Sequence, residues 1–416
     1  MANITNTQIA IIGGGMVGAA LATLLACART TWKVTLIEAF PFPAKDTDAE
    51  PIYQPSFDAR STAIAAGSVQ LFEQAGVWQQ LKQHATAINQ VHVSDKGHIG
   101  GTVIDKNDLG EKALGYVIPN AWIGNVLLNH IQQQSNIDII APAQVKRLQP
   151  KQTGAALLIE NEDENFTLDC ELAVIADGAQ SPLRKQLGID VEVHNYQQTA
   201  IIANVAFDQP HNGIAYERFT DQGPMALLPL GESEQGCESA LVWTQPQDQA
   251  ERILALDEAG FLAELQQRFG FRLGNFTKVG KRDSYPLELL VAKEQVRSSI
   301  AVMGNAAHFL HPVAGQGFNL ALRDCAALVA ELAAAFDQDL PLGNLDSLLR
   351  YQQTQENDQL ATIRGSDTLT KLFSTDQLPQ AALRALGFIG LEALPVSKQW
   401  LSMQSMGQAG RRVNLQ

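Results

Sequence analysis

Three glycines follow a short apolar run near the beginning of the chain. Gly13, Gly15 and Gly18 have GxGxxG spacing after the β-branched segment 8–12, and the Ala/Leu-rich stretch 19–28 comes next. In a strand–turn–helix unit of this kind, the first glycine makes the tight turn, the second admits a pyrophosphate and the third lets helix and strand pack closely. The helix N-terminus adds N–H groups and about half a positive charge. The spacing therefore indicates a dinucleotide-phosphate site.

Glu38 supports this interpretation. It ends a second apolar run, 33–37, and stands twenty residues after Gly18. An acid at this distance can accept hydrogen bonds from the ribose hydroxyls of an adenosine. A glycine-rich turn alone can be purely structural, but the flanking strand patterns and Glu38 favour binding. The motif does not distinguish NAD from FAD as the bound dinucleotide.

Two later apolar runs also end in polar loops. The first run, 172–176, leads into Asp177-Gly178-Ala179-Gln180-Ser181-Pro182-Leu183-Arg184. By itself, an Asp-Gly pair is also compatible with a surface turn. The second run, 299–303, leads into the segment 304–319, GNAAHFLHPVAGQGFN. Together the two loops resemble motifs of the single-component flavin aromatic hydroxylases, the family typified by para-hydroxybenzoate hydroxylase; Asp177, Gly178, Ser181 and Arg184 match its DGxxSxxR pattern.

The resemblance implies FAD as the cofactor, with NAD(P)H as a transient co-substrate and O2 as the oxidant. It places Asp177, Gly178 and Arg184 near both nucleotides. In the second loop it implies FAD contacts from Gly304, Asn305, Pro312, Gly315, Gly317, Phe318 and Asn319. Many relatives have an acid where this chain has Asn305, and an amide can still donate and accept hydrogen bonds there. This departure matches the ubiquinone-biosynthesis branch, which hydroxylates 2-polyprenyl-6-methoxyphenol.

The flavin-side loop comprises His311, Pro312, Gly315, Gln316 and Gly317, and no catalytic side chain is assigned in it. His308 and His311 are expected to be hydrogen-bonded packing residues. A helix is predicted over 319–336, with a core face of Leu320, Leu328, Val329 and Leu332. Its N-terminus would stabilise negative charge at the flavin pyrimidine edge.

Other segments of the chain resemble further parts of the same family. Arg60, in the run 57–65, matches an arginine on the flavin side of the cofactor cleft, and a surface ion pair with Asp58 is the alternative. Asn125 stands where many relatives carry a basic residue. Tyr216, Arg218 and Tyr285 are the substrate candidates, and each has a core or rim position as its alternative.

These motifs need a particular scaffold. The predicted fold is mixed α/β, with a Rossmann-like FAD-binding domain, an inserted antiparallel-sheet substrate domain and C-terminal helices. The FAD domain is assigned to 1–80, 105–190 and 288–345, the substrate domain to 81–104 and 191–287, and the helical region to 346–416. Within the last region, the apolar run 385–391 is expected to be buried or to face a membrane or partner.

Composition excludes several classes of function. With 416 residues, 45% of them apolar, the chain can bury a large core, and its net charge of -14 disfavours nucleic acid and anionic lipid headgroups. The sequence has no run of about 18 apolar residues, and no secretory signal is expected from the stretch that begins at Met1. No Cys/His cluster has metal-ligand spacing, so no metal is expected, and the four cysteines are predicted to be buried thiols in a reducing cytoplasm. Any contact with the inner face of the membrane must be mainly apolar.

The resemblance implies that NAD(P)H reduces the flavin, O2 forms a C4a-hydroperoxyflavin, and an electron-rich phenol ring receives the oxygen. Hydroxylation of a polyprenyl phenol in ubiquinone biosynthesis is the function predicted, with other proteins of that pathway as expected partners. Three alternatives stay open: hydroxylation at another ring position, a non-oxygenating flavin oxidoreductase acting on a prenyl lipid, and a non-catalytic assembly flavoprotein. The oligomeric state is not predicted.

Overall fold

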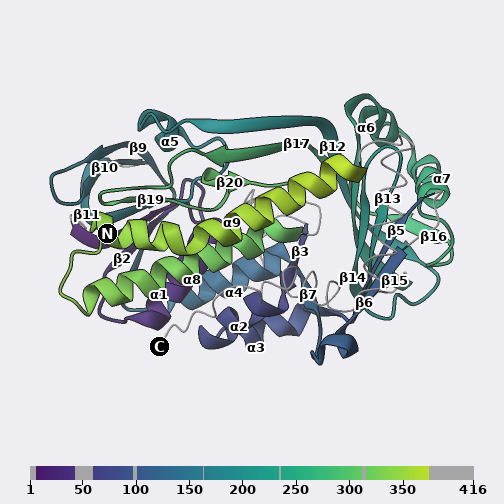
Figure 1. Ribbon diagram of the computed structural model, residues 1–416, viewed down its shortest axis with the longest axis horizontal. Helices are drawn as coiled ribbons and strands as arrows, with labels where there is room; N and C mark the ends of the chain where they lie inside the picture. The colour runs from purple at the N-terminus through teal and green to yellow at the C-terminus, as the bar shows by residue number, and fades with distance from the viewer. Residues whose placement is uncertain are drawn as a thin grey trace.

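The computed structural model describes residues 6–42, 60–96, 101–162, 164–233, 236–311 and 315–373. It has a mixed α/β architecture, as the sequence predicts. A helix-covered sheet of eight strands occupies one end of the long axis and a sheet of nine strands the other, with a three-stranded sheet between them (Figure 1). None of the described helices has an apolar stretch long enough to cross a membrane.

The eight-stranded sheet carries the glycine turn. Its parallel core has the order β8-β2-β1-β11-β19, so the three strands that the motifs follow, β1, β11 and β19, are neighbours in the sheet. The bounds are β1 Asn6–Ile12, β2 Val34–Ile37, β8 Ile137–Ile140, β11 Asn165–Ile175 and β19 Ile300–Val302. A short strand, β18 (Val296–Arg297), adds an antiparallel edge beside β19. The carboxyl ends of parallel strands share one sheet edge, which brings the three motif loops together.

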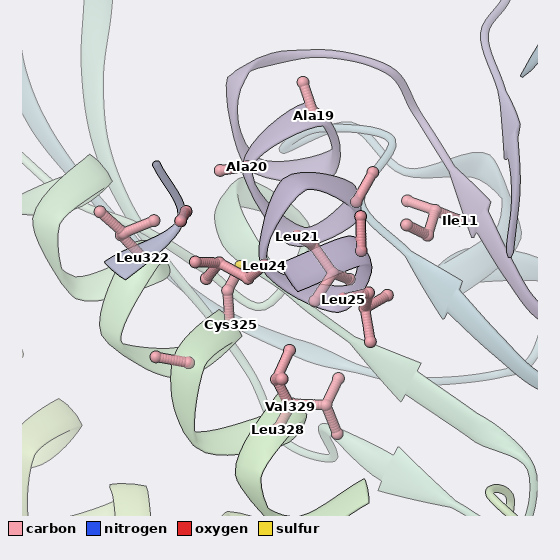
Figure 2. Packing of buried hydrophobic residues seen from close by; sticks show 14 of the residues in the cluster. Ile11, Ala19, Ala20, Leu21, Leu24, Leu25, Leu322, Cys325, Leu328 and Val329 are labelled. Atoms are coloured by element: carbon pink, nitrogen blue, oxygen red, sulfur yellow. The ribbon is translucent and has the colours of Figure 1, made fainter. Parts of the chain in front are cut away.

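Helices cover one face of this sheet, and their apolar sides make the main core. They are α1 Met16–Ala28, α4 Asn120–Gln132 and α8 Gln316–Phe336. Leu21, Leu24 and Leu25 of α1 point toward α8, from which Cys325 and Leu328 face back (Figure 2). The predicted core face of α8 is confirmed, because its four residues are all buried.

The other face of the sheet is covered by a second apolar cluster. The strands β9 (Ala143–Pro150) and β10 (Ala155–Asn161) extend antiparallel from β11 and contribute Val145, Leu148 and Leu157. The short helix α5 (Pro182–Gln186) lies beside them with Leu183 buried. Both faces of β1 and β11 are therefore buried, which is typical of parallel strands.

The nine-stranded sheet is mostly antiparallel, as predicted, and among its described strands only β13 and β5 pair in parallel. Its strands are β5 Gln90–Asp95, β6 Gly101–Asp105, β12 Val191–Phe207, β13 Ile214–Phe219, β14 Met225–Ser233, β15 Gly236–Pro246, β16 Phe276–Val279, β17 Asp283–Ala292 and β20 His308–Phe309. The long strands β12 and β17 run back toward the eight-stranded sheet (Figure 1). Because β12 and β17 belong to one sheet and extend toward the other, the structure does not separate the two regions at a single residue. The domain boundaries assigned from the sequence therefore remain predictions.

Two helices within this region were not predicted. The helices α6 (Gln247–Leu254) and α7 (Glu258–Phe269) lie on the outer face of the nine-stranded sheet (Figure 1). A capping signal for α7 is present in the sequence, because the Asp257 side chain accepts a hydrogen bond from Gly260 N. Phe261, Leu265 and Phe269 of α7 pack onto the sheet.

The small sheet joins the two larger ones. It consists of β3 Ser61–Ala65, β7 Gly115–Pro119 and β4 Thr86–Ile88, all antiparallel, and the helices α2 Ala66–Gln74 and α3 Trp78–Leu81 follow β3. The last described helix, α9 (Leu345–Phe373), packs along α8. The predicted tail beyond Phe373, including the run 385–391, lies outside the described residues.

The cysteine prediction is only half right. All four thiols are unbonded, and Cys170 and Cys325 are buried. Cys27 and Cys237 are partly exposed, which corrects the expectation that all four are buried. Desolvation raises the pKa of Cys170 to about 12, so this thiol stays protonated and inert near neutral pH.

Candidate functional site

The turn after β1 makes close backbone contacts that require glycine. Gly13 has a φ of +105°, and a Cβ at this position would lie 2.4 Å from the carbonyl oxygen of Ala176, at the end of β11. A Cβ on Gly18 would lie 1.9 Å from the carbonyl oxygen of Gly13. Gly15 is the N-cap of α1 and provides no side-chain cap. The first N–H groups of the helix therefore face the edge at which the motif loops meet.

Glu38 lies at the same edge, directly after β2. Its Oε2 accepts a hydrogen bond of 2.6 Å from Gly14 N, and its Oε1 accepts one of 2.9 Å from Phe40 N. These backbone donors fix the carboxylate beside the glycine turn. A carboxylate has about four acceptor positions, so Glu38 can still accept from a diol.

Asp177 is the least satisfied polar group of the site. Both of its carboxylate oxygens are buried and have no hydrogen-bond partner among the described residues. Burial raises the pKa of Asp177 more than the nearby Ser181 hydroxyl and the Arg184 guanidinium lower it. Burial outweighs the weak donors that reach this carboxylate, so donors from a bound hydroxylated ligand would stabilise it.

Arg184 links the second and third motifs. It is only 2% exposed; its Nη1 donates to the carbonyl oxygen of Ala306 at 2.7 Å, and its Nη2 donates to that of Ala179 at 2.9 Å. Arg184 was predicted to bind the cofactor. In the structure it holds the two cofactor loops against each other, its Nε is buried without a partner among the described residues, and its contact with the cofactor stays a prediction.

The loop after β19 lies against the start of α1. Gly304 has a φ of +60°, and a Cβ there would lie 2.9 Å from Cγ2 of Val17. The next residue, Asn305, is exposed, so its amide is accessible at the shared edge. This arrangement suits the predicted contact of Asn305 with a polar part of the cofactor.

Asn319 holds the N-terminus of α8 against β3. Its Nδ2 donates to the carbonyl oxygens of Ala63 at 2.8 Å and Gly315 at 2.9 Å, and its Oδ1 accepts from Ala65 N at 2.8 Å. Gly315, with a φ of +60°, is the N-cap of the helix. Asn319 is therefore a buried positioning residue.

Gly317 has open space around it, and Gln316 and Phe318 are partly exposed beside it. The predicted loop residue Pro312 lies outside the described residues.

The two histidines of this segment are both buried. His308 Nε2 lies 2.6 Å from Oδ2 of Asp324 in α8, and Gln359 Nε2 in α9 donates to Asp324 Oδ1 at 3.0 Å. His308 is thus a hydrogen-bonded packing residue, as expected. Burial lowers the pKa of His311 to about 4, and its ring lies 5.3 Å from the Tyr196 ring, in an edge-to-face contact. A neutral imidazole is therefore expected at physiological pH.

Arg60 and Tyr285 come together although they are far apart in the sequence. The guanidinium carbon of Arg60, directly before β3, lies 5.7 Å from the centre of the Tyr285 ring on β17. A predicted cofactor residue thus contacts a predicted substrate residue.

Asn125 lies elsewhere, on the exposed side of α4, where its Oδ1 accepts a hydrogen bond from Asn129 Nδ2.

Tyr216 and Arg218 occupy the core and rim positions that were the alternative to a substrate contact. Successive residues of a strand point to opposite faces, and the register across β13, β14, β15 and β12 places Tyr216 on the face opposite Tyr285. There the Tyr216 ring packs 5.4 Å from that of Phe269 in α7. Arg218 shares this outer face, and its Nε donates to the carbonyl oxygen of Arg268. Because side chains alternate along a strand, the sequence could have predicted that Tyr216 and Arg218 lie on one face of the sheet and Glu217 on the other.

The site as a whole fits FAD. Glycine contacts without room for a side chain, the α1 N-terminus, Glu38 and the unsatisfied Asp177 carboxylate all lie along the carboxyl edge of the parallel sheet. A dinucleotide supplies phosphates for the helix end and hydroxyl groups for the two acids. Within the described ranges, no group of three or more His, Cys, Asp or Glu side chains is arranged to hold a metal ion.

Comparison with known proteins identifies relatives over nearly the whole chain. Residues 6–353 match the family described as "FAD binding domain". The ubiquinone hydroxylase UbiL of Rhodospirillum rubrum is 33% identical over 403 residues, 96% of this chain and 89% of that protein. The 3-demethoxyubiquinol 3-hydroxylase of Escherichia coli is 30% identical over 405 residues, 96% of this chain and 98% of that protein. The crystal structure of p-nitrophenol 4-monooxygenase PnpA from Pseudomonas putida shares the fold, with a TM-score of 0.77 at 17% identity over 99% of this chain and all of that one.

Proposed function

This chain belongs to the FAD-binding-domain family of flavoproteins, and we propose that it is a monooxygenase that hydroxylates the ring of a polyprenyl phenol in ubiquinone biosynthesis. Its co-substrates are NAD(P)H and O2. The specific substrate proposed is a 2-polyprenyl-6-methoxyphenol. The same pathway also includes hydroxylations at other ring positions, and the experiment below distinguishes these positions.

One observation carries the proposal. The chain is 33% and 30% identical, over 96% of its length, to two proteins named as hydroxylases of ubiquinone or of its demethoxy precursor. The geometry of the site supports it, because the three loops meet at one sheet edge below the apolar inner face of the nine-stranded sheet. A ring that lies between this face and the flavin would be shielded from water.

Each part of the site has a separate task. The turn at Gly13–Gly18 and the N-terminus of α1 hold the pyrophosphate, Glu38 accepts from the adenosine ribose, and Asp177 and Asn305 bind polar groups of the remaining cofactor. When bound, FAD supplies the redox chemistry that moves electrons from NAD(P)H and one oxygen atom from O2 to the ring. The protein orients the phenol and excludes water.

The apolar substrate also determines where the enzyme must work. A polyprenyl phenol resides in lipid, so we propose peripheral contact with the inner face of the membrane by apolar side chains, with other ubiquinone-biosynthesis proteins as partners. The net charge of -14 disfavours electrostatic attachment to anionic headgroups. Binding to lipid vesicles should accordingly show little dependence on salt.

The test measures oxygen transfer directly. FAD-loaded protein is supplied with NAD(P)H and ¹⁸O₂, with and without 2-prenyl-6-methoxyphenol or the matching demethoxyquinol, and the products are analysed by mass spectrometry. We expect one ¹⁸O atom in a ring hydroxyl of the product, and the product structure gives the ring position. Substrate-dependent oxidation of NAD(P)H without label in any organic product would indicate a non-oxygenating oxidoreductase. Bound FAD that no pyridine nucleotide reduces would indicate an assembly role.

A further inference from the structure

The face of the nine-stranded sheet that meets the cofactor side carries a carboxylate, Glu217, on the interior strand β13. Glu217 pairs across the sheet with Ala226 on β14 and Val93 on β5, and Ala226 pairs in turn with Val242. Val242 is opposite Ile202 on β12. These residues form one row on one face, because directly paired residues of neighbouring strands point the same way.

This row lies between two apolar clusters through which the inner face of the sheet contacts other parts of the site. On one side, Ala215 clusters with residues of the small sheet, including Ala63, which lies within 3.5 Å of a Cβ built on Gly315. On the other side, Ile202 clusters with Tyr196 and Tyr285.

The second contact continues into the cofactor loops. Tyr285 meets the Arg60 guanidinium, and Tyr196 meets the His311 ring. The row that contains Glu217 is thus flanked on both sides by elements that hold the cofactor loops, and it faces the same way as Tyr285.

The surroundings of Glu217 are apolar. It keeps some exposure to solvent, yet burial raises the pKa of its carboxyl to about 8, and no charged side chain contributes to that shift. The strand registers place several other titratable groups on this face: Asp95 and Asp283 at strand ends, Tyr196 and Tyr285, Glu238 on β15 and Lys278 on β16 beside Ala206, and Glu192 and His194 toward the far end of β12. Arg60 and His311 approach from the cofactor side.

A carboxylate in such a position needs a hydrogen-bond donor. The ring hydroxyl of a phenol is a suitable donor, and its ordinary pKa near 10 is close enough to that of a buried acid for effective proton transfer. A substrate carboxylate would instead be repelled, so the position suits a phenol without an acidic substituent.

We propose that Glu217 is a catalytic residue that accepts the hydroxyl proton of the phenol substrate. The inference rests on the proposed function. In this step the O–H bond of the phenol breaks, its electron pair stays on the phenol oxygen, and the proton binds a carboxylate oxygen of Glu217. The ring becomes more electron-rich at the positions ortho and para to that oxygen, where a new hydroxyl is added. The step is reversible and consumes no oxidant.

The test compares Glu217→Gln, Glu217→Asp and the wild type, with Asp283→Asn as the matched control. Asp283 belongs to the same row, but it lies at the sheet edge, half exposed and 2.9 Å from Lys281. All four proteins are loaded with FAD. Affinity for 2-prenyl-6-methoxyphenol is followed by the perturbation of flavin absorbance, and hydroxylation by incorporation of ¹⁸O between pH 6 and pH 9.5 (roughly two units below and more than one above the carboxyl pKa).

For the wild type we expect a hydroxylation rate that rises with pH to a plateau above about 8, where the carboxylate predominates. Glu217→Gln should lower the plateau rate about 100-fold and remove this pH dependence, with FAD content and phenol affinity within about threefold of wild type. Glu217→Asp should keep the pH dependence, and Asp283→Asn should match the wild type. With a ring-fluorinated, more acidic phenol, the deficit of Glu217→Gln should shrink.

Two failures can be told apart. A wild-type enzyme that places no label in any phenol would overturn the proposed function and the role of Glu217 with it. A wild type that hydroxylates the phenol, together with a Glu217→Gln variant of equal rate and pH dependence, would overturn only the role of Glu217. An equal loss for ordinary and acidic phenols would also overturn it, because structural damage does not depend on the acidity of the substrate.

Discussion

Glycines of two different kinds line the turn before α1. Gly13 and Gly18 are required by the fold, because a Cβ on either would overlap a backbone oxygen. Gly15 has a φ of -66° and a ψ of -171°, which other residues adopt readily. Its glycine is therefore better explained by the close approach of a phosphate than by the backbone.

This difference predicts the effect of Gly15→Val. The protein should fold normally, while the valine side chain blocks the pyrophosphate and reduces FAD occupancy by at least tenfold, a cost of about 1.4 kcal/mol or more in binding. Occupancy is measured from flavin absorbance per mole of purified protein, and folding from circular dichroism. The comparison variant is Gly18→Val, which should lower the stability of the fold itself. Full flavin occupancy in Gly15→Val would contradict the placement of the pyrophosphate.

Among the elements, those with a strong apolar period could be predicted from the sequence. The strands around the three motifs and the core face of α8 are where the sequence predicts them, although α8 begins three residues before Asn319, at Gln316. That start depends on the left-handed conformation of Gly315 rather than on apolar spacing. Element ends are decided by such local capping geometry.

Other features depend on tertiary contacts that a single sequence does not contain. Alternation along β13 separates Tyr216 from Glu217, but only the pairing with β14 and the position of α7 determine which face meets the cofactor side. The contacts from Arg60 to Tyr285 and from Tyr196 to His311 join residues more than a hundred positions apart. No local pattern identifies partners at such separations.

Asn319 provides a test at the scale of elements. Removing its amide in Asn319→Ala leaves the buried N–H of Ala65 and the part-buried carbonyl of Ala63 without these hydrogen bonds. The free energy of unfolding of the FAD-free protein should fall by roughly 2–4 kcal/mol, as expected for three lost hydrogen bonds with unsatisfied partners. Denaturant titration measures this change.

The matched control for Asn319 is Asn129→Ala. Asn129 is exposed on α4 and donates one hydrogen bond to Asn125, so its loss should change the free energy of unfolding by no more than about 0.5 kcal/mol. If both variants lost the same amount, the connection between α8 and β3 would not depend on Asn319.

For the whole molecule, buried polar groups connect parts of the chain that form separate layers. The hydrogen bonds that Asp324 accepts from Gln359 and shares with His308 join the loop after β19 to α8 and α9. Gln359 also exchanges hydrogen bonds with Gln295, next to β18. A buried network of this kind stabilises one arrangement of its elements, although His308 Nδ1 has no hydrogen-bond partner among the described residues. His311 is also buried but lies outside this network. It is therefore better suited than His308 to test how the free energy of unfolding depends on pH.

His311 predicts a loss of stability in mild acid. Its pKa is about 4 in the folded protein and near 6.5 in an unfolded chain, so between these values the unfolded state binds more protons. The free energy of unfolding should therefore fall as pH decreases through this window, by up to roughly 3 kcal/mol from this residue. In His311→Gln that contribution should disappear, while His194→Gln, at an exposed position whose ring also contacts Tyr196, should behave as the wild type. Denaturant titrations of all three proteins at pH 7.5 and pH 4.5 (roughly one unit above the unfolded pKa and just above the folded one) measure it. A constant difference between His311→Gln and wild type at both pH values would mean that burial of a neutral His311 does not control the acid stability of the molecule.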